Sequence, residues 1–241
     1  MARRQDWKCW LITRSISEPE VLILVDELDR RGLTPSSTKS DEFPELQCWQ
    51  IKVASSISGE AIIYTRSAGN DDNNSPKNRF EACLFSDNEK LGLLMRNWIA
   101  QHTESFVEKM EFQNPLMIAI ADCILQQGLR GVRILYEPET QNRHLKKMEF
   151  DFAEPDVRAL VQSHGNQENA LSKCILPYLQ SQTGIRCHIL PLSEVRIQDR
   201  VIVTPEALGT LNGDGSVLKA LASPLLGLFN AFYREAIAKN Q

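Results

Sequence analysis

Three carboxylates, Glu137, Glu149 and Asp151, are the side chains of this sequence whose types and spacing best suit chemistry. Residues 149 and 151 share one face of an expected strand, because successive strand side chains alternate between faces. Three carboxylates that converge can hold Mg²⁺ for hydrolysis or for phosphodiester chemistry. The alternative is a solvated strand face, since Arg133 and Lys147 interleave with these acids as cross-strand partners. We favour the solvated face.

Segment 130–147 combines basic side chains with a tyrosine. A β-hairpin of this composition can lie along RNA or single-stranded DNA. The contacts would come from Arg130, Arg133, Tyr136, Arg143, Lys146 and Lys147. Glutamates in the same segment oppose phosphate binding, so a solvated hairpin is again the simpler interpretation.

The remaining reactive side chains are scattered. None of the 4 histidines and 6 cysteines has another of these two residue types two to four positions away, so zinc-site spacing is absent. The sequence also lacks a phosphate-binding glycine loop and a nucleophile elbow, and we expect no cofactor. His102 lies on an apolar helical stripe, where it is either an acid–base group or a packed histidine. Asp122 lies in an apolar helix, and Gln126 one turn later indicates a narrow polar stripe.

In the first half of the chain, the clearest element is a helix at 18–31. Ser17 and Glu20 form a capping box before it, and Gly32 is suited to end it. We expect a strand at 7–16 before this helix and a polar loop at 34–45 after it. Strands at 46–54, 60–66 and 80–85 follow, the first two as a hairpin, with an exposed polar loop at 67–78. Amphipathic spacing then predicts helices at 88–112 and 114–128 that form a helical hairpin.

In the second half, strands at 132–137 and 144–152 are expected to form a hairpin with one apolar and one charged face. Helices at 154–163 and 167–182 should follow, the second bent or broken at Pro177. Short strands at 185–192 and 200–203, a short helix that begins at 204–206 and a turn at 212–215 complete the pattern. A final apolar helix at 216–238 is expected to be interrupted at Ser223–Pro224.

Apolar side chains cover more than half of the circumference of this final helix. Burial is the default interpretation of such a helix, and a surface for a partner is the alternative. That partner surface would consist of Leu225, Leu228, Phe229, Phe232 and Tyr233.

Successive strands joined by short loops predict an α+β fold. We expect two lobes, an N-terminal lobe at 1–112 and a C-terminal lobe at 113–241. Each lobe would have its own small, mostly antiparallel sheet packed by helices.

Composition limits the class of protein. A net charge of −4, with 42% hydrophobic and 24% charged residues, is typical of a soluble globular protein. No uninterrupted apolar stretch has the length of a membrane span, and cysteines within apolar runs indicate reduced thiols and a cytoplasmic location. We therefore expect a non-catalytic protein that binds another macromolecule, as an assembly, accessory or regulatory factor. The partner would be a protein, and a metal-dependent hydrolase or nuclease, or a nucleic-acid binder, are the alternatives.

Overall fold

The computed structural model describes residues 4–43, 46–66, 80–138, 146–165, 168–211 and 216–239. The expected loop at 67–78 and the turn at 212–215 lie outside these residues. The α+β class is confirmed: within the described residues, six α-helices accompany one antiparallel sheet of 11 strands. The expectation of two separate small sheets is wrong. One strand, β1 (Arg4–Ile12), contributes residues to both compact units of the chain, so the strands are not divided into two sets.

Two compact units make up the chain. The N-unit contains residues 6–110 and 229–241, and the C-unit contains residues 1–5 and 111–228. Each unit therefore includes a segment from the opposite end of the chain.

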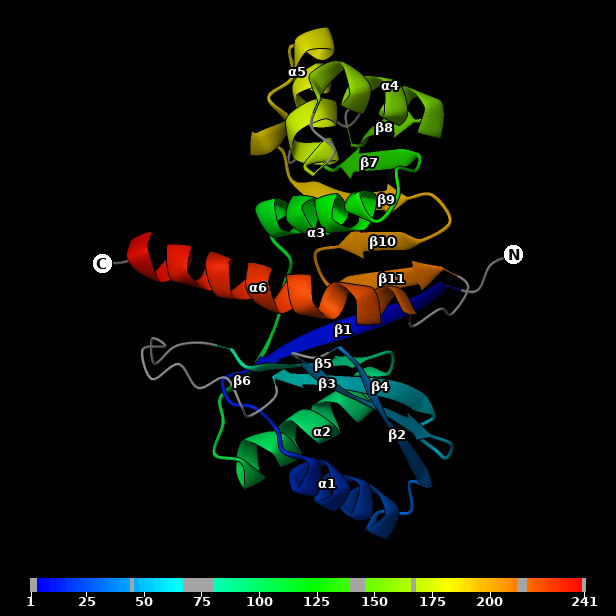
Figure 1. The fold of residues 1–241 in the computed structure, drawn as a ribbon, viewed down its shortest axis with the longest axis vertical. Helices are drawn as coiled ribbons and strands as arrows, with labels where there is room; N and C mark the ends of the chain where they lie inside the picture. The colour runs from blue at the N-terminus through cyan, green and yellow to red at the C-terminus, as the bar shows by residue number, and fades with distance from the viewer. Residues whose placement is uncertain are drawn as a thin grey trace. The chain divides into compact units, whose positions relative to one another are not determined.

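The N-unit contains a run of strands in the order β2, β3, β4, β5, β1, with β6 also paired to β1 (Figure 1). The bounds are β2 Pro35–Phe43, β3 Leu46–Val53, β4 Gly59–Arg66, β5 Ala82–Ser86 and β6 Val107–Lys109. The expected β3–β4 hairpin is confirmed, with Trp49 opposite Ile63 and Ile51 opposite Ala61.

Strand β2 replaces the polar loop that we expected at 34–45, so that expectation is wrong. It pairs with β3 from Pro35 opposite Val53 to Phe43 opposite Leu46, with an irregularity after Ser40. Polar side chains obscured the strand because β2 is an edge strand, which pairs only with β3 among the described strands.

Helices α1 (Glu18–Arg30) and α2 (Glu89–His102) lie on the same side of these strands (Figure 1). The capping box at the start of α1 is confirmed: the Ser17 amide donates to Glu20 Oε2 at 2.8 Å. Gly32 has a positive φ of 74° just after the helix, as its expected role requires. The buried core beneath the helices includes Trp10, Trp49, Ile63, Leu84 and Met95.

Helix α2 ends ten residues before the expected end at 112. The Thr103 hydroxyl donates to the Ile99 carbonyl at 2.7 Å, and Glu104 has a positive φ of 50°. The chain then continues as β6, whose Val107 lies opposite Ile12 of β1. The expected helical hairpin is also wrong, because α2 and the next helix belong to different units.

The C-unit contains the strands β11, β10, β9, β7, β8, in that order. Their bounds are β7 Val132–Tyr136, β8 Met148–Phe152, β9 Leu192–Ile197, β10 Val201–Thr204 and β11 Ala207–Leu211. The β7–β8 hairpin is confirmed, with Ile134 opposite Phe150 and Arg133 opposite Asp151. Instead of the short helix expected from 204, residues 205–206 form a tight turn between β10 and β11, where the Thr204 hydroxyl donates to the Ala207 carbonyl.

Helix α3 (Asn114–Gln126) packs against β9 and β10, and α4 (Glu154–His164) follows β8. The break expected near Pro177 is confirmed: a π-helix, η1 (Ala170–Ile175), changes there into the α-helix α5 (Leu176–Thr183). Pro177 thus lies in the first turn of α5, where a missing N–H costs little. The strand expected at 185–192 is instead a 3-10 turn, η2 (Cys187–Ile189), followed by β9.

Helix α6 (Ser216–Lys239) continues through Pro224 without the expected interruption. Its residues up to Leu228 belong to the C-unit and those from Phe229 to the N-unit. Among the helices of the described residues, none has both the length and the apolar character needed to cross a bilayer.

Candidate protein-binding site

Ion pairs occupy the charged face of the β7–β8 hairpin. Arg133 lies 3.3 Å from Glu149 and 3.0 Å from Asp151, and Lys147 lies 3.1 Å from Glu137. The hydrogen bond that Arg133 donates to Asp151, together with the negative charge of Glu149, raises the pKa of Arg133. The three carboxylates of the hypothetical metal site therefore face cations. Within the described residues, no group of three or more His, Cys, Asp or Glu side chains could hold a metal ion.

The basic residues of the same hairpin are largely neutralised in the same way. Arg130 lies 3.7 Å from Glu154, so its charge is shared with a carboxylate as well. Tyr136 is buried, and burial raises the pKa of its hydroxyl, so its ring is not available to stack on a base. Lys146 is exposed, and Arg143 lies outside the described residues. The hairpin thus presents little uncompensated positive charge to phosphates.

His102 is a surface residue that packs on the helix carrying it. Its ring stacks on Trp98 with 4.4 Å between the centroids, and its Nδ1 lies 3.0 Å from the Trp98 carbonyl oxygen.

Asp122 is buried and binds the start of the π-helix η1. Its carboxylate accepts hydrogen bonds from the amides of Leu171, at 2.7 Å, and of Ser172, at 3.3 Å. Burial raises the pKa of Asp122, although these hydrogen bonds and the charge of Lys173 act in the opposite direction. Asp122 therefore caps a helix from another element and joins α3 to η1.

The proposed partner surface on α6 is largely turned inward. Leu225 and Phe229 are each 1% exposed, so they belong to the core. Leu228 and Phe232 are half-buried, and the side chain of Tyr233 lies outside the described part.

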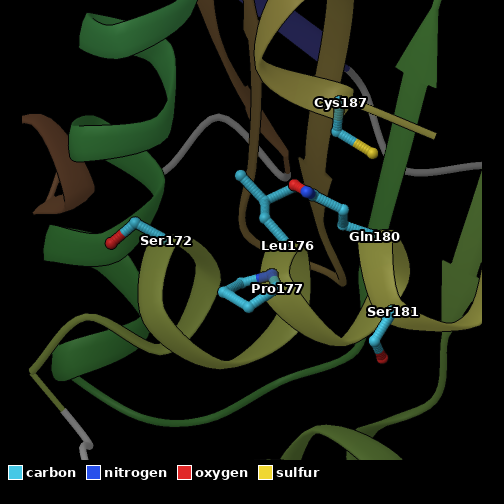
Figure 2. A pocket seen from close by; sticks show the side chains of 6 residues that line it. All are labelled: Ser172, Leu176, Pro177, Gln180, Ser181 and Cys187. Atoms are coloured by element: carbon cyan, nitrogen blue, oxygen red, sulfur yellow. The ribbon is translucent and has the colours of Figure 1, made fainter. Parts of the chain in front are cut away.

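A hollow in the C-unit, which we call the α5 hollow, was not foreseen from the sequence. It has a volume of about 480 Å³ and is lined by Ser172, Leu176, Pro177, Gln180, Ser181 and Cys187. Figure 2 shows Leu176 and Gln180 one turn apart on α5, with their side chains directed toward each other and Cys187 on the facing segment. Cys187 is buried, whereas the other five residues are exposed or half-buried.

The sequence contains one local signal related to this hollow, which is Pro177. Pro177 marked a break, which the structure resolves as a π-helix followed by α5, and π-helical turns are frequent at functional sites. Ile189, in the η2 turn that begins with Cys187, is 66% exposed. The sequence pattern of a strand at 185–192 hid this exposure.

Comparison with known proteins gives two matches. The model of the IML3 family matches residues 38–217. "Inner kinetochore subunit IML3" of Saccharomyces cerevisiae is 21% identical over 122 residues, which cover 47% of this chain and 50% of that relative. The chain thus matches about half the length of this curated relative.

The expectation of a cytoplasmic protein is wrong. The findings that overturn it are the family match and the relative, whose name describes that protein as a subunit of the inner kinetochore. Composition could not have revealed this, because buried reduced thiols are equally compatible with the nucleus and the cytoplasm. Since the family model covers well over half of the sequence, from the edge strand β2 to the start of α6, the chain belongs to the IML3 family.

Proposed function

We propose that this chain is a non-catalytic subunit of the inner kinetochore and that it works by binding other proteins. The observation that carries this proposal is the family match over residues 38–217. The yeast relative adds the assembly, because its name describes a subunit of the inner kinetochore.

The chemistry of the described side chains agrees with a binding role. The carboxylates on the β7–β8 hairpin are committed to ion pairs, and Asp122 is committed to backbone amides. Large apolar side chains nevertheless reach the surface at Leu22, Ile23, Leu93, Phe106, Tyr178 and Ile189. Exposed apolar groups beside polar ones are what protein interfaces use.

Two further parts of the proposal concern the place of binding. The α5 hollow is the contact region that we favour, and Leu228 and Phe232 of α6 are secondary candidates. We also keep the division into lobes at 1–112 and 113–241 as a proposal for how the binding surfaces are distributed along the chain.

Imaging in cells of the source organism tests the proposal. The full chain carrying a fluorescent tag should form nuclear foci that coincide with a marker of the centromeric nucleosome, and the tag alone should not. Purification under native conditions should recover it with other inner-kinetochore subunits. A tagged chain that stays diffuse in the cytoplasm throughout the cell cycle would refute the proposal.

A further inference from the structure

The α5 hollow is an open and mixed surface. Leu176 and Pro177 supply apolar groups, and Ser172, Gln180 and Ser181 supply hydroxyl and amide groups. Because Cys187 is the one buried lining residue, the hollow opens to solvent and is shallow. A shallow hollow of this kind suits a single side chain presented by another molecule better than an enclosed small ligand.

Two exposed cations are sequence neighbours of residues that line the hollow. Lys173 precedes Pro177 by one helical turn, and Arg186 is the residue before Cys187. Neither has an ion pair within the described residues, whereas Arg133, Arg158 and Arg196 each have a carboxylate within about 3 Å.

Few acidic residues accompany these two cations in the segment that lines the hollow. Glu168 is the single acidic residue in segment 168–190. The negative charge of Asp122 partly offsets the positive charge of Lys173. However, the Asp122 carboxylate is buried and accepts hydrogen bonds from the Leu171 and Ser172 amides. Segment 168–190, which supplies all the lining residues, therefore carries more cationic than acidic side chains, and we call its two cations the positive rim.

We infer that the α5 hollow binds an acidic segment of a protein partner and takes up one apolar side chain from that segment. Lys173 and Arg186 would pair with carboxylates on either side of the apolar side chain, and Ile189 would widen the apolar contact. This inference rests on the proposed function and adds the chemistry of the partner to it.

A nucleic acid is the competing ligand for a positive rim. Stable binding of a phosphate backbone usually requires several cations, whereas only Lys173 and Arg186 are available here, beside the apolar Leu176 and Pro177. Leu176 and Pro177 add apolar contact area that a peptide side chain can use and a phosphate backbone cannot, so the acidic peptide is favoured.

Fluorescence anisotropy with three labelled peptides tests the inference on the full chain. The probes are a 12-residue Glu/Asp-rich peptide with one central Leu, the same peptide with Ala in that place, and a Lys-rich peptide with the Leu. We expect the acidic Leu peptide to bind at least roughly tenfold more tightly than the other two. Raising the salt concentration should weaken its binding.

Surface variants locate the site with little risk to folding. Lys173→Glu and Arg186→Glu should each weaken binding of the acidic Leu peptide several-fold, and Ile189→Ser should remove the preference for Leu over Ala. Lys146→Glu is the matched control, because Lys146 is an exposed cation of the same unit that neither lines the hollow nor belongs to segment 168–190. It should leave binding unchanged.

Several outcomes would overturn the inference: equal binding of the three peptides, no binding of the acidic Leu peptide, or loss of binding in Lys146→Glu alone. Duplex DNA that displaces the peptide at a lower concentration than the unlabelled peptide does would assign the rim to nucleic acid instead. Self-association abolished by Arg186→Glu would assign it to a second copy. If Arg186→Glu still forms centromeric foci while the peptide fails to bind wild type, the inference falls and the proposed function stands.

Discussion

Asp122 supplies a cap that the sequence of the capped helix does not contain. Residue 169, at the N-cap position of η1, makes no side-chain hydrogen bond to the helix, and the first amides bind the carboxylate from α3 instead. A buried carboxylate that accepts backbone N–H groups compensates part of its desolvation cost.

Asp122→Ala should destabilise the chain, because it leaves the Leu171 and Ser172 amides without a partner. We expect a loss of about 1–3 kcal/mol in the free energy of unfolding. Faster hydrogen exchange should be confined largely to segment 170–183. Asp156→Ala, which removes an exposed acid from the first turn of α4, should cost less than about 1 kcal/mol. Equal effects of the two variants would contradict the capping role.

The raised pKa of Asp122 predicts a pH dependence with a definite sign. The folded state binds the proton more tightly than the unfolded state, so this group favours folding most at low pH. This contribution to stability falls as the pH rises from the pKa of the unfolded state, 3.8, through the raised pKa of the folded state. Asp122→Asn, which can still accept the amides, should therefore gain stability relative to wild type as pH rises. Urea midpoints measured from about pH 4 to 7 check this, and a constant difference would refute it.

At the scale of elements, Gly92 decides how closely α2 approaches the strands. A Cβ at this position would lie 2.3 Å from Cη2 of Trp10, whose ring is fully buried. The helix and β1 can therefore pack at their observed distance only because residue 92 has no side chain.

Gly92→Ala should destabilise the N-unit by about 1–3 kcal/mol, since the Trp10 ring has no free space to move into. Gly227→Ala in α6 is the matched control. Nothing lies within 4 Å of a Cβ at residue 227, so the higher helix propensity of alanine should add about 0.5–1 kcal/mol. Denaturant unfolding of both variants measures the contrast. Similar changes in the two would show that Gly92 tolerates a side chain.

Elements with local signals were predictable from the sequence. Ser17 and Glu20 fixed the start of α1, and the short loop of the β3–β4 hairpin fixed its register. The sequence did not predict strand β2, because an edge strand can carry polar side chains. The predicted end of α2 was wrong, because Thr103 and Glu104 end the helix inside a continuous apolar pattern. The α5 hollow could not be predicted, because Ser172 and Cys187 meet only through the packing of η1, α5 and η2.

At the scale of the whole molecule, each end of the chain belongs to the unit that the other half of the chain mainly forms. Residues 1–5 belong to the C-unit and residues 229–241 to the N-unit. The N-unit includes residues 229–241, and Asn230 shows how that segment is held. The Asn230 side chain accepts from the Phe80 amide at 2.9 Å and donates to the Phe80 carbonyl at 3.1 Å. One side chain from α6 thus binds both backbone groups of Phe80.

A chain that ends at Leu228 should therefore lose part of the N-unit's stability. We expect hydrogen exchange to accelerate in β5, next to Phe80, while strands β7 to β10 keep their protection. Asn230→Ala should give a smaller loss at the same place, about 1–3 kcal/mol, because it removes two hydrogen bonds to buried backbone groups.

Unchanged exchange in β5 for both chains would show that the N-unit does not need the end of α6. A removal of residues 240–241 alone serves as the control, since it leaves Asn230 in place.

The Asn230–Phe80 pair spans 150 positions of the chain, and this spacing has a consequence for synthesis on the ribosome. At roughly 5–20 residues per second, Phe80 waits on the order of 10–30 seconds before Asn230 is translated. During that interval the nascent N-unit lacks the two hydrogen bonds that Asn230 makes with Phe80. Folding of this protein therefore finishes after translation nears its end, although most of the N-unit is among the first parts to be made.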